Sequence, residues 1–422
     1  MELPLNHNQP AIMHMDLNSC FATVEQQANM HLRGKPLVIA AYISPGGCII
    51  SPSIEAKRLG IKVGMTVRDA KLIYKNVIVR DPDPLLVRDV HIKFKRIFQT
   101  YSPIVIPKSI DEAVIDFTGT PAFKKGLVNI AKEIKQRLRE EIGEWISCSI
   151  GIATNRFLAK LGASIHKPDG LDVIDYKNLQ QIYSSVKLVD LHGINTRYEA
   201  RLNASGIFTP LQFLNASERF LHKQVFKGIV GYYWYLRLRG FEIDDVEFKR
   251  KSYGQEYSLG KKTADPEELS HIIMKLCEKM GGRLRRSNHA SLGIHVAVLY
   301  DDWTFWHRGR KINQPLYTTQ ELFIKAMWIF NQQPQRKTVA KLAVSCYDLI
   351  PASSSQMSLF DIEENKKRKI SDAIDSINDR YGEFVITPAL MMNMKDLVVD
   401  RVAFGSVKEL EDLYASSTST IY

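Results

Sequence analysis

Short apolar runs alternate with helix-spaced apolar positions over the first 174 residues of the chain. The run Ile12 to Met15 predicts a buried strand, and the apolar stretch 104–117 predicts a β-hairpin. Residues 84–101 repeat their apolar side chains at helical spacing, and the pattern continues with a predicted helix over 121–142 and a predicted strand over 146–153. This order of elements predicts an α+β sheet with helices packed on one face.

The rest of the chain divides into segments with different apolar patterns. Residues 22–83 mix strand and helix patterns, whereas residues 175–243 have helical spacing only. After a basic stretch at 248–254, the order of patterns predicts a β-α-β-β-α-β domain. The elements expected in these segments are strands 37–42 and 48–51, helices 53–59 and 67–74, strand 255–259, helix 266–287, hairpin 291–310, helix 320–330, strand 339–349 and a further helix 364–381.

Three carboxylates interrupt this apolar pattern. Asp16 ends the first predicted strand, and Asp111 and Glu112 stand side by side within the predicted hairpin. Adjacent carboxylates in a buried strand repel each other and lose hydration, so a cation is expected to neutralise them. Lys108 is one local candidate and a bound divalent metal is the other, unless the pair lies solvated at a hairpin end. An all-oxygen site suits Mg²⁺, and two such ions about 3.5–4 Å apart serve phosphoryl transfer.

The sequence around these acids resembles three motifs of one family. Residues 15–25 read Met-Asp-Leu-Asn-Ser-Cys-Phe-Ala-Thr-Val-Glu, and residues 109–113 read Ser-Ile-Asp-Glu-Ala. Residues 149–161 read Ser-Ile-Gly-Ile-Ala-Thr-Asn-Arg-Phe-Leu-Ala-Lys-Leu, followed by Lys-Pro-Asp-Gly at 167–170. In this order and at this spacing, the motifs resemble those of Y-family translesion DNA polymerases of the DinB type, and the resemblance runs from about residue 10 to about residue 360.

The resemblance implies an α+β multidomain fold, the right-hand polymerase. It has a palm, small fingers, a helical thumb with helix-hairpin-helix turns and a β-α-β-β-α-β little finger. The boundaries that it implies are palm 1–21 and 84–174, fingers 22–83, thumb 175–243, linker 244–254, little finger 255–350 and a C-terminal tail 351–422 with a clamp-binding peptide at 356–360.

The resemblance also implies a two-metal nucleotidyl transfer site. The catalytic residues are expected to be Asp16, Asp111 and Glu112. The same side chains, with the backbone carbonyl of Leu17, are expected to bind two Mg²⁺ ions. Mn²⁺ is possible in their place because it accepts the same oxygen ligands. Positioning and electrostatics then supply the rate, with little need for a side-chain general base.

The triphosphate site departs from the family pattern. The residues expected at the triphosphate are Lys167, Lys57, Cys20 and Phe21. Many family members carry Tyr and Arg where this chain has Ile54 and Lys57, and a lysine keeps the charge but loses the bidentate fork of arginine. We therefore expect weaker or differently arranged nucleotide binding, unless the neighbouring Arg58 compensates.

Two further features of the family concern selectivity. Phe21 lies five residues after Asp16 and is expected to be the steric gate that excludes a 2′-hydroxyl, although an ordinary core phenylalanine would look the same. The new base pair is expected under small or aliphatic residues near Ile49, Ile50 and Ser51. Such a roof presses weakly on the base pair and fits low-fidelity synthesis.

Several residues are expected to contact DNA. Gly193, Gly228 and Gly231 lie in two turns that resemble helix-hairpin-helix turns, where glycine lets the backbone N–H groups approach a phosphate. An ordinary αα-turn has the same composition, and His192 and Asn195 depart from the family pattern. The basic residues expected along the duplex backbone are Arg283, Arg285, Arg286, Arg308, Arg310 and Lys311.

A short peptide beyond the last predicted strand implies a protein partner. Residues 356–360 read Gln-Met-Ser-Leu-Phe and resemble the peptide that binds the bacterial β sliding clamp. Leu359 and Phe360 are expected to enter an apolar pocket of the clamp, and Gln356 to set the direction. The other expected partners are primer–template DNA and deoxynucleoside triphosphates, and the protein is expected to be a monomer.

Composition agrees with a polyanionic partner. The chain of 422 residues has a formal net charge of +11 and a pI of about 9.2. Five cysteines, odd in number and scattered, argue against a disulfide scaffold and fit a reducing cytoplasm. No signal-peptide pattern opens the sequence, and no apolar run reaches the roughly 18 residues of a membrane span.

Three alternatives stand beside the polymerase interpretation. A catalytically inactive accessory relative would have lost metal carboxylates, and this chain keeps all three. The residues after 360 leave a second alternative open, namely a UmuC-type polymerase subunit that needs accessory proteins. A palm-type nucleotidyl cyclase would not need helix-hairpin-helix turns, a basic fourth domain or a clamp peptide.

Overall fold

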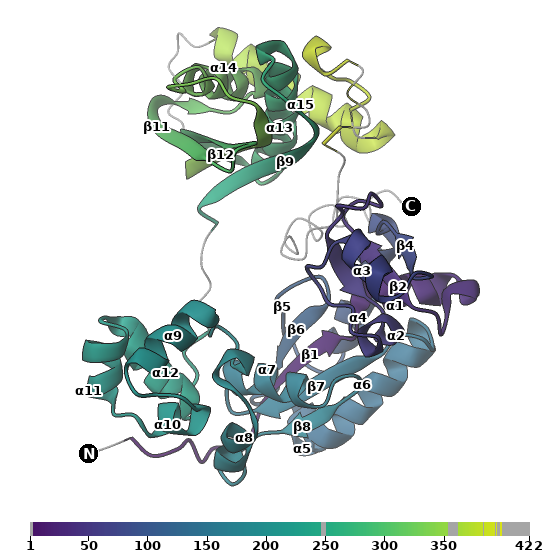
Figure 1. The fold of residues 1–422 in the computed structure, drawn as a ribbon, viewed down its shortest axis with the longest axis vertical. Coiled ribbons are helices and arrows are strands. Elements are labelled where there is room, and N and C mark those ends of the chain that lie inside the picture. The colour runs from purple at the N-terminus through teal and green to yellow at the C-terminus, as the bar shows by residue number, and fades with distance from the viewer. Residues whose placement is uncertain are drawn as a thin grey trace. The chain divides into compact units, whose positions relative to one another are not determined.

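A computed structural model describes residues 3–245, 250–352 and 362–398, without 383, 393, 395 and 396. The described residues form two compact units, residues 3–245 and residues 250–398. Each unit has its own sheets and its own hydrophobic core (Figure 1). Among the helices of the described residues, none is both long and apolar enough to cross a membrane.

The largest sheet of the first unit carries the predicted acids. Its strands in spatial order are β5 (Ile104–Pro107), β6 (Glu112–Asp116), β1 (Ile12–Leu17), β7 (Cys148–Ala153) and β8 (Leu171–Val173). β1 is central and runs antiparallel to both β6 and β7. β5 and β6 form the hairpin that the apolar run predicts. The register of β1 and β6 places Asp16 directly opposite Glu112.

Helices cover both faces of this sheet, so the prediction of a single covered face is wrong. The helices are α4 (Pro84–Gln99), α5 (Pro121–Lys124), α6 (Leu127–Glu141) and α7 (Arg156–Ile165). Met13 packs with α4 and α6 on one face, whereas its neighbour Ile12 packs with α7 on the other. Gly151 in β7 permits the close approach of α7, because a Cβ there would lie 1.9 Å from the Ala159 carbonyl oxygen.

The single helix expected over 121–142 is broken in two. α5 ends at Lys124 and α6 begins at Leu127. Gly126 between them has a φ of +85°, a left-handed conformation that glycine adopts without steric cost.

The segment between β1 and α4 contains a small sheet with a core of its own. Its elements are α1 (Cys20–Ala28), η1 (Met30–Leu32), β2 (Leu37–Ala40), β3 (Ile49–Pro52), α2 (Ile54–Arg58), α3 (Val67–Ile73) and β4 (Ile78–Arg80). β2 pairs antiparallel with β3 and parallel with β4. Val38, Ile49 and Ala56 meet in the core of this sheet.

Residues 175–243 are helical, as their spacing predicts. Their elements are α8 (Leu179–Ser185), η2 (Leu188–Asp190), α9 (Thr196–Ala204), α10 (Pro210–Asn215), α11 (Glu218–Phe220), the π-helix η3 (Leu221–Val225) and α12 (Ile229–Leu238). Asn155 links α12 to α7 through hydrogen bonds. Its side-chain oxygen accepts from the Leu158 N–H at 2.8 Å, while its amide donates to the carbonyls of Arg237 and Phe241 at 2.9 and 3.0 Å.

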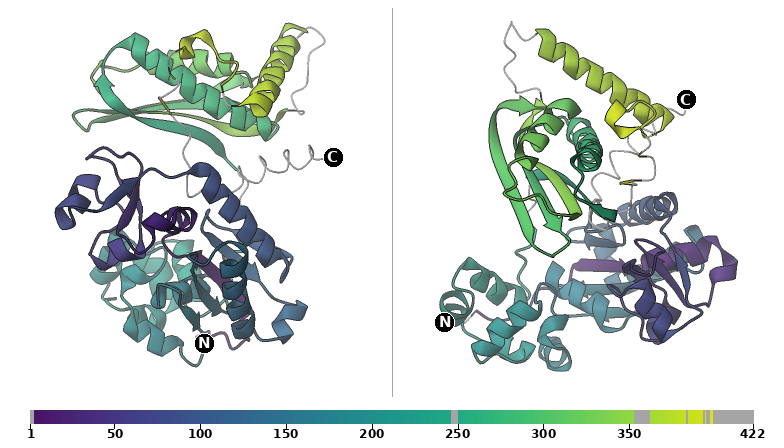
Figure 2. Two further views of the ribbon diagram at one scale, coloured as in Figure 1. Left: turned by 90° about the vertical axis from the view of Figure 1, so that its right-hand side faces the viewer. Right: turned by 45° about the horizontal axis from the view of Figure 1, so that its top comes forward.

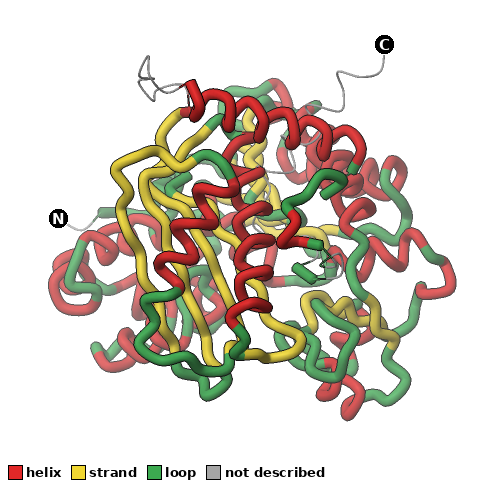
Figure 3. Tube along the Cα trace, turned by 90° about the horizontal axis from the view of Figure 1, so that it is seen from above, coloured by secondary structure: helices red, strands yellow, loops and turns green. Residues whose placement is uncertain are grey.

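The second unit has the predicted β-α-β-β-α-β order. Its elements are β9 (Ser252–Thr263), α13 (Pro266–Arg286), β10 (His289–Tyr300), β11 (Phe305–Leu316), α14 (Thr319–Phe330) and β12 (Val339–Pro351). The antiparallel sheet has the order β11-β10-β12-β9, and α13 and α14 lie across its strands (Figure 3). β9 begins at Ser252, which pairs with Tyr347, so the last part of the predicted linker belongs to the strand.

The second unit extends well beyond residue 350, the predicted boundary of the little finger. α15 (Ile362–Tyr381) packs on the end of α13, and η5 (Ala389–Met391) follows it (Figure 2). Arg285 and Arg286 of α13 form ion pairs with Asp375 and Asp379 of α15 at 2.6 and 2.9 Å. These long-range ion pairs make α15 part of the unit rather than of a tail.

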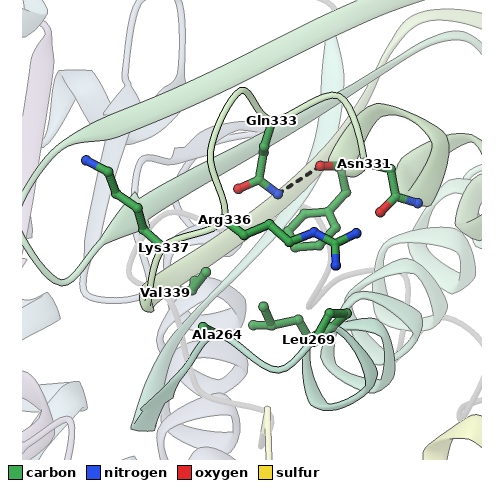
Figure 4. Close-up of a pocket in the computed structure, with 9 residues that line it drawn as sticks. Ala264, Leu269, Asn331, Gln333, Arg336, Lys337 and Val339 are labelled. Carbon is green, nitrogen blue, oxygen red and sulfur yellow. Dashed lines mark hydrogen bonds between the residues drawn. The ribbon is translucent and has the colours of Figure 1, made fainter.

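A small pocket lies where the start of α13 meets the loop after α14 (Figure 4). Its volume of about 20 Å³ is room for about one water molecule. The Gln333 side chain donates to the Phe330 carbonyl at 2.8 Å beside it, and Arg336 lines its rim. The pocket is too small for a nucleotide.

Candidate active site

Three carboxylates meet at one edge of the large sheet of the first unit. Asp16 of β1 lies opposite Glu112 of β6, and the Leu17 N–H donates to the Asp111 carbonyl at 2.9 Å. The hydroxyl of Ser109 donates to the Asp111 carboxylate at 2.5 Å. The antiparallel register therefore brings together three acids that lie almost a hundred residues apart in the sequence.

Two lysines neutralise two of these acids. Lys167 contacts Asp16 at 2.5 Å, and Lys160 of α7 contacts Glu112 at 2.6 Å. Within the described residues, Asp111 forms no ion pair with a lysine or arginine. In the same part of the chain, no three acids, histidines or cysteines form a preassembled metal-ligand cluster.

The surroundings of Asp111 disfavour its charged form. Burial raises the pKa of Asp111 to about 6, and the negative charges of Asp16 and Glu112 add to the rise. The hydrogen bond from Ser109 opposes it. The charge of Asp111 is thus compensated only in part by the protein itself.

The pKa values of Asp16 and Glu112 shift in opposite directions. Burial raises the pKa of Asp16, although Lys167 opposes the effect. Burial acts on Glu112 in the same sense, but His14 and Lys160 outweigh it, so the pKa of Glu112 is lowered. The imidazole of His14 is 2% exposed and its Nε2 lies 3.7 Å from the Glu112 carboxylate.

The carboxylates open into a cavity of about 610 Å³, large enough for a nucleotide. Its walls come from β1 and α1, from the hairpin, from β3 and α2, and from the loop after α7. The lining residues are Asp16, Leu17, Asn18, Ser19, Cys20, Ile50, Ser51, Pro52, Ile54, Lys57, Arg58, Val63, Ser109, Asp111, Glu112, Lys167 and Pro168.

The predicted triphosphate residues Lys57 and Lys167 both line this cavity, as does Arg58. Burial lowers the pKa of Lys57, and the charge of Lys167 lowers it further, which places the two ammonium groups near each other. Ile54 also lines the cavity, and its aliphatic side chain offers no hydrogen-bond donor to a phosphate. The cavity is thus lined by three cations and three acids, and one of the cations, Lys167, forms an ion pair with Asp16.

The selectivity residues fall partly outside the cavity wall. Cys20 lines it, but Phe21 is fully buried in the core beneath, so its role as steric gate stays a prediction. Ile50 and Ser51 line the cavity, whereas Ile49 is fully buried in the core of the small sheet. Ile49 is therefore no part of the roof, and the pairing of β3 with β2 is irregular here, since a bulge lies between the pairs Ile39–Ser51 and Ala40–Ile49.

The glycine turns offer fewer free N–H groups than expected. The N–H groups of Gly228 and Gly231 donate to the carbonyls of His222 and Gly228. A Cβ at Gly231 would lie 2.3 Å from the Leu221 carbonyl oxygen, so this glycine serves helix packing. Gly193 has a φ of +96° and shapes its turn. N–H groups of Gly228 and Gly231 are thus not available to a phosphate, which corrects that expectation.

Asn195 further changes the first of these turns. Its side-chain oxygen accepts from the N–H groups of Arg197 and Tyr198 at 3.1 and 3.0 Å, so it caps α9. The N-terminus of α12 is different, because Ile229 and Val230 are exposed there and no side chain caps it.

The predicted DNA-contacting arginines differ in burial and in their bonding partners. Arg285 is buried and donates to Asp375, Tyr317 and Thr319, and Arg286 pairs with Asp379. These contacts hold α15 on α13. Arg285 is too deeply buried to follow the duplex, so that expectation is wrong, whereas the expectation for the partly exposed Arg286 stays a prediction. Four other predicted DNA contacts also remain: Arg283, Arg308, Arg310 and Lys311. Arg283 donates hydrogen bonds to Gly254 and Gln255, and Arg308 donates one to Gln332. Arg310 and Lys311 lie on β11.

The clamp-binding peptide lies outside the described residues, so Gln356, Leu359 and Phe360 stay predictions. The sequence interpretation did not identify two residues of the site, Lys160 and His14. A signal for Lys160 was present, because it is a cation within the apolar stripe of a helix that follows a strand of the acidic site. His14 lies two residues before Asp16 and so shares its face of β1.

Two family models match the chain. The impB/mucB/samB family matches residues 15–164, and the impB/mucB/samB family C-terminal domain matches residues 250–359. The chain is 30% identical to DNA polymerase IV of Pelotomaculum thermopropionicum over 403 residues, which are 92% of this chain and 97% of the relative. It is 32% identical to DNA polymerase IV of Moorella thermoacetica over 391 residues, 90% of this chain and 96% of the relative.

Solved structures share the fold. A Y-family DNA polymerase chimera of Dbh and Dpo4 matches with a TM-score of 0.69 and 24% identity, over 80% of this chain and 99% of the other. An insertion ternary complex of Dbh DNA polymerase matches with a TM-score of 0.57 over the same shares. Fold and site together define the class as Y-family DNA polymerase. The chain belongs to the impB/mucB/samB family, and its relatives there are of the DNA polymerase IV, or DinB, type.

Proposed function

We propose that this chain is a template-directed DNA polymerase of the low-fidelity translesion type, which adds deoxynucleotides to a primer 3′-hydroxyl. The observation that carries the proposal is the convergence of Asp16, Asp111 and Glu112 on one cavity that also exposes Lys57 and Lys167. Acids and cations that line the same cavity suit a nucleoside triphosphate with its metal ions. Relatives named DNA polymerase IV that align over almost the whole chain support the same activity.

The residues fit a pair of divalent ions, Mg²⁺ in the first place and Mn²⁺ as a substitute. The donors are all oxygens: the three carboxylates and the carbonyl of Leu17, which also lines the cavity. The raised pKa of Asp111 reflects negative charge that the chain leaves partly uncompensated. When bound, the ions lower the pKa of the attacking hydroxyl and neutralise the leaving pyrophosphate.

The side chains around the cavity bind and orient the substrate. Lys167 exchanges its contact with Asp16 for the triphosphate, and Lys57 and Arg58 add charge to the same wall. Lys160 keeps Glu112 ionised and directed into the cavity. Ile50 and Ser51 roof the site without a large ring, so a distorted base pair meets little steric resistance. Phe21 closes the floor as the steric gate.

The proposed partners follow from the same function. Primer–template DNA is held by the thumb, through the exposed N-terminus of α12, and by basic residues of the little finger, Arg283, Arg308, Arg310 and Lys311. The palm, fingers, thumb and little finger have the extents predicted above, with α15 added to the little finger. The β sliding clamp binds Gln356, Leu359 and Phe360, and the enzyme acts as a cytoplasmic monomer.

The alternatives are less well supported. All three carboxylates are present and face the cavity, which an inactive accessory relative does not require. The UmuC type, which needs accessory subunits, would be inactive alone. A nucleotidyl cyclase has no use for the second unit with its four-stranded sheet.

The experiment is primer extension by the purified full chain with Mg²⁺ and deoxynucleotides. The expected result is addition of the nucleotide that the template specifies, lost on chelation and restored by Mg²⁺ or Mn²⁺. Extension without a template or incorporation unrelated to template sequence would reject the proposal. Activity only after addition of accessory subunits would favour the UmuC type.

A further inference from the structure

A buried histidine of the first unit contacts the hairpin that carries Asp111. His91 belongs to α4 and is 1% exposed. Its imidazole packs edge-on against the Phe94 ring, which lies nearly one turn further along the same helix, with ring centroids 4.7 Å apart and an interplanar angle of 89°. This contact fixes the plane of the imidazole. A polar ring at this depth is costly unless it makes a hydrogen bond.

The hydrogen bond of His91 leads to the backbone next to Asp111. The Nδ1 atom of His91 lies 2.9 Å from the carbonyl oxygen of Ile110. Because a carbonyl oxygen only accepts, Nδ1 carries the proton and donates it to this bond. Ile110 lies in the turn of the hairpin, since β5 ends at Pro107 and β6 begins at Glu112. Its carbonyl is therefore outside the β5–β6 ladder and takes its partner from a side chain of α4.

Two peptide planes flank the Cα atom of Asp111, and a hydrogen bond holds each of them. The Ile110 carbonyl shares a planar peptide group with the Asp111 nitrogen, and His91 holds this plane. The Asp111 carbonyl accepts from the Leu17 N–H at 2.9 Å, which holds the following plane. Only the φ and ψ angles of Asp111 lie between the two planes, so the two bonds together fix both angles. They therefore set the direction in which the Asp111 side chain leaves the backbone.

The turn of the hairpin is anchored at two more points. The hydroxyl of Ser109 donates to the Asp111 carboxylate at 2.5 Å, which sets the rotation of the carboxylate. The Ile110 side chain is 1% exposed and lies in the same hydrophobic core as Phe94. Supporting contacts of this kind keep the side chains of a site in their productive geometry.

We propose that His91 is a positioning residue for the polymerase reaction, which holds the Ile110 peptide plane and thereby aims the Asp111 carboxylate at the divalent ions. The inference rests on the proposed function and deepens it. A misplacement of about 1 Å at a reacting centre costs on the order of a hundredfold in rate. His91 is not among the residues that line the cavity, whereas Lys57 and Lys167 are. We therefore expect His91 to act on the chemical step and not on nucleotide binding.

Three replacements of His91 separate its hydrogen bond from its packing. In His91→Asn the amide nitrogen takes the place of Nδ1, because both atoms are bonded to Cγ. In His91→Gln the amide lies one bond further out, and His91→Leu fills the space without a donor. The matched control is Ile97→Ala, because Ile97 is 2% exposed in the same helix and core. Ile97→Ala opens a cavity and leaves the bond to Ile110 in place.

The first measurement is single-nucleotide primer extension by the full chain at saturating Mg²⁺, well below the Tm of each variant. His91→Leu and His91→Gln are expected to lower kcat about tenfold or more and to change the nucleotide KM by less than about twofold. His91→Asn and Ile97→Ala should keep kcat within about threefold of wild type. Equal kcat in the Asn and Gln variants would overturn the proposal, and so would a raised KM with unchanged kcat. This comparison of Asn with Gln decides the matter even where His91→Leu does not fold.

Hydrogen exchange gives a readout that needs neither activity nor bound metal. Mass spectrometry of the full chain follows the backbone amides of the hairpin, residues 104–117, and the amide of Leu17, which donates to Asp111. Exchange is expected to be severalfold faster in His91→Leu and His91→Gln than in wild type, and unchanged in His91→Asn. Equal exchange in all of these proteins would show that the hairpin is held without His91 and would reject the proposal. If the wild-type chain fails to extend primers while exchange differs as expected, the proposed function fails and the positioning of Asp111 by His91 stands.

Discussion

Replacing Arg285 by alanine is expected to destabilise the second unit strongly, whereas the same change at Arg286 is not. The Arg285 side chain is 3% exposed, and its guanidinium donates to both carboxylate oxygens of Asp375 at 2.6 and 2.9 Å. It also donates to the carbonyl of Tyr317 and the hydroxyl of Thr319, each at 3.2 Å. Alanine removes all four bonds and leaves Asp375, 14% exposed, without a cation.

The magnitude follows from this burial. Removing one partner of a buried ion pair costs about 3–5 kcal/mol of unfolding free energy, because the other charge stays buried alone. Arg286 and Asp379 are 31% and 43% exposed, and an exposed pair contributes about 0–1 kcal/mol. At roughly 2–4 °C per kcal/mol for a unit of this size, the Tm of the second unit falls by on the order of 10 °C for Arg285→Ala and by less than about 4 °C for Arg286→Ala.

The assay is thermal unfolding of the full chain with both variants. The double variant Arg285→Met with Asp375→Leu should recover most of the loss, since apolar side chains of similar volume replace a buried pair at little cost. Below the transition, Arg285→Ala should leave the salt dependence of DNA binding unchanged, whereas loss of a phosphate contact lowers the slope by about 1. Equal Tm shifts for the two alanine variants, or a lower salt slope for Arg285→Ala, would refute the structural role of Arg285.

Three further predictions concern the substrate and the clamp. The double change Ile54→Tyr with Lys57→Arg should lower the nucleotide KM several-fold, because it adds a hydroxyl donor and a bidentate fork; an unchanged KM would reject that reasoning. Phe21→Ala should admit ribonucleotides, while Phe123→Ala, at a partly buried phenylalanine packed against the same core, should not; continued exclusion by Phe21→Ala would show that another residue is the gate. Changing Leu359 and Phe360 to alanine should abolish stimulation by the β clamp and leave unstimulated extension intact, and stimulation that survives both changes would exclude the peptide.

Much of the catalytic unit could be predicted because its determinants are local. A strand that ends in Asp16 and a hairpin that carries Asp111 and Glu112 are both visible as apolar runs interrupted by acids. Once these strands pair as neighbours, the acids have no other place to lie. The β-α-β-β-α-β order of the second unit was readable for the same reason, since each element has its own period and its own turn residues.

The errors arose where a residue's partner lies far away in the sequence. Arg285 was interpreted as a DNA contact because its acid, Asp375, is 90 residues downstream in a helix with no local link to it. Gly151 gave no sign that α7 would cover the second face of the sheet, because the close contact depends on Ala159 in three dimensions. Ile49 was misplaced because the pairing of β3 with β2 is irregular between Ile49 and Ser51, and this irregularity depends on the partner strand.

The carboxylate site is the central claim, and the two aspartates at opposite ends of β6 test it most directly. Asp111 directly precedes β6 and faces the cavity, whereas Asp116 ends β6 and accepts a hydrogen bond from the Thr118 N–H. Primer extension should be abolished in Asp111→Asn and remain within a few-fold of wild type in Asp116→Asn, with both variants folded by circular dichroism. Extension by Asp111→Asn at a rate close to that of the unchanged enzyme would contradict the account.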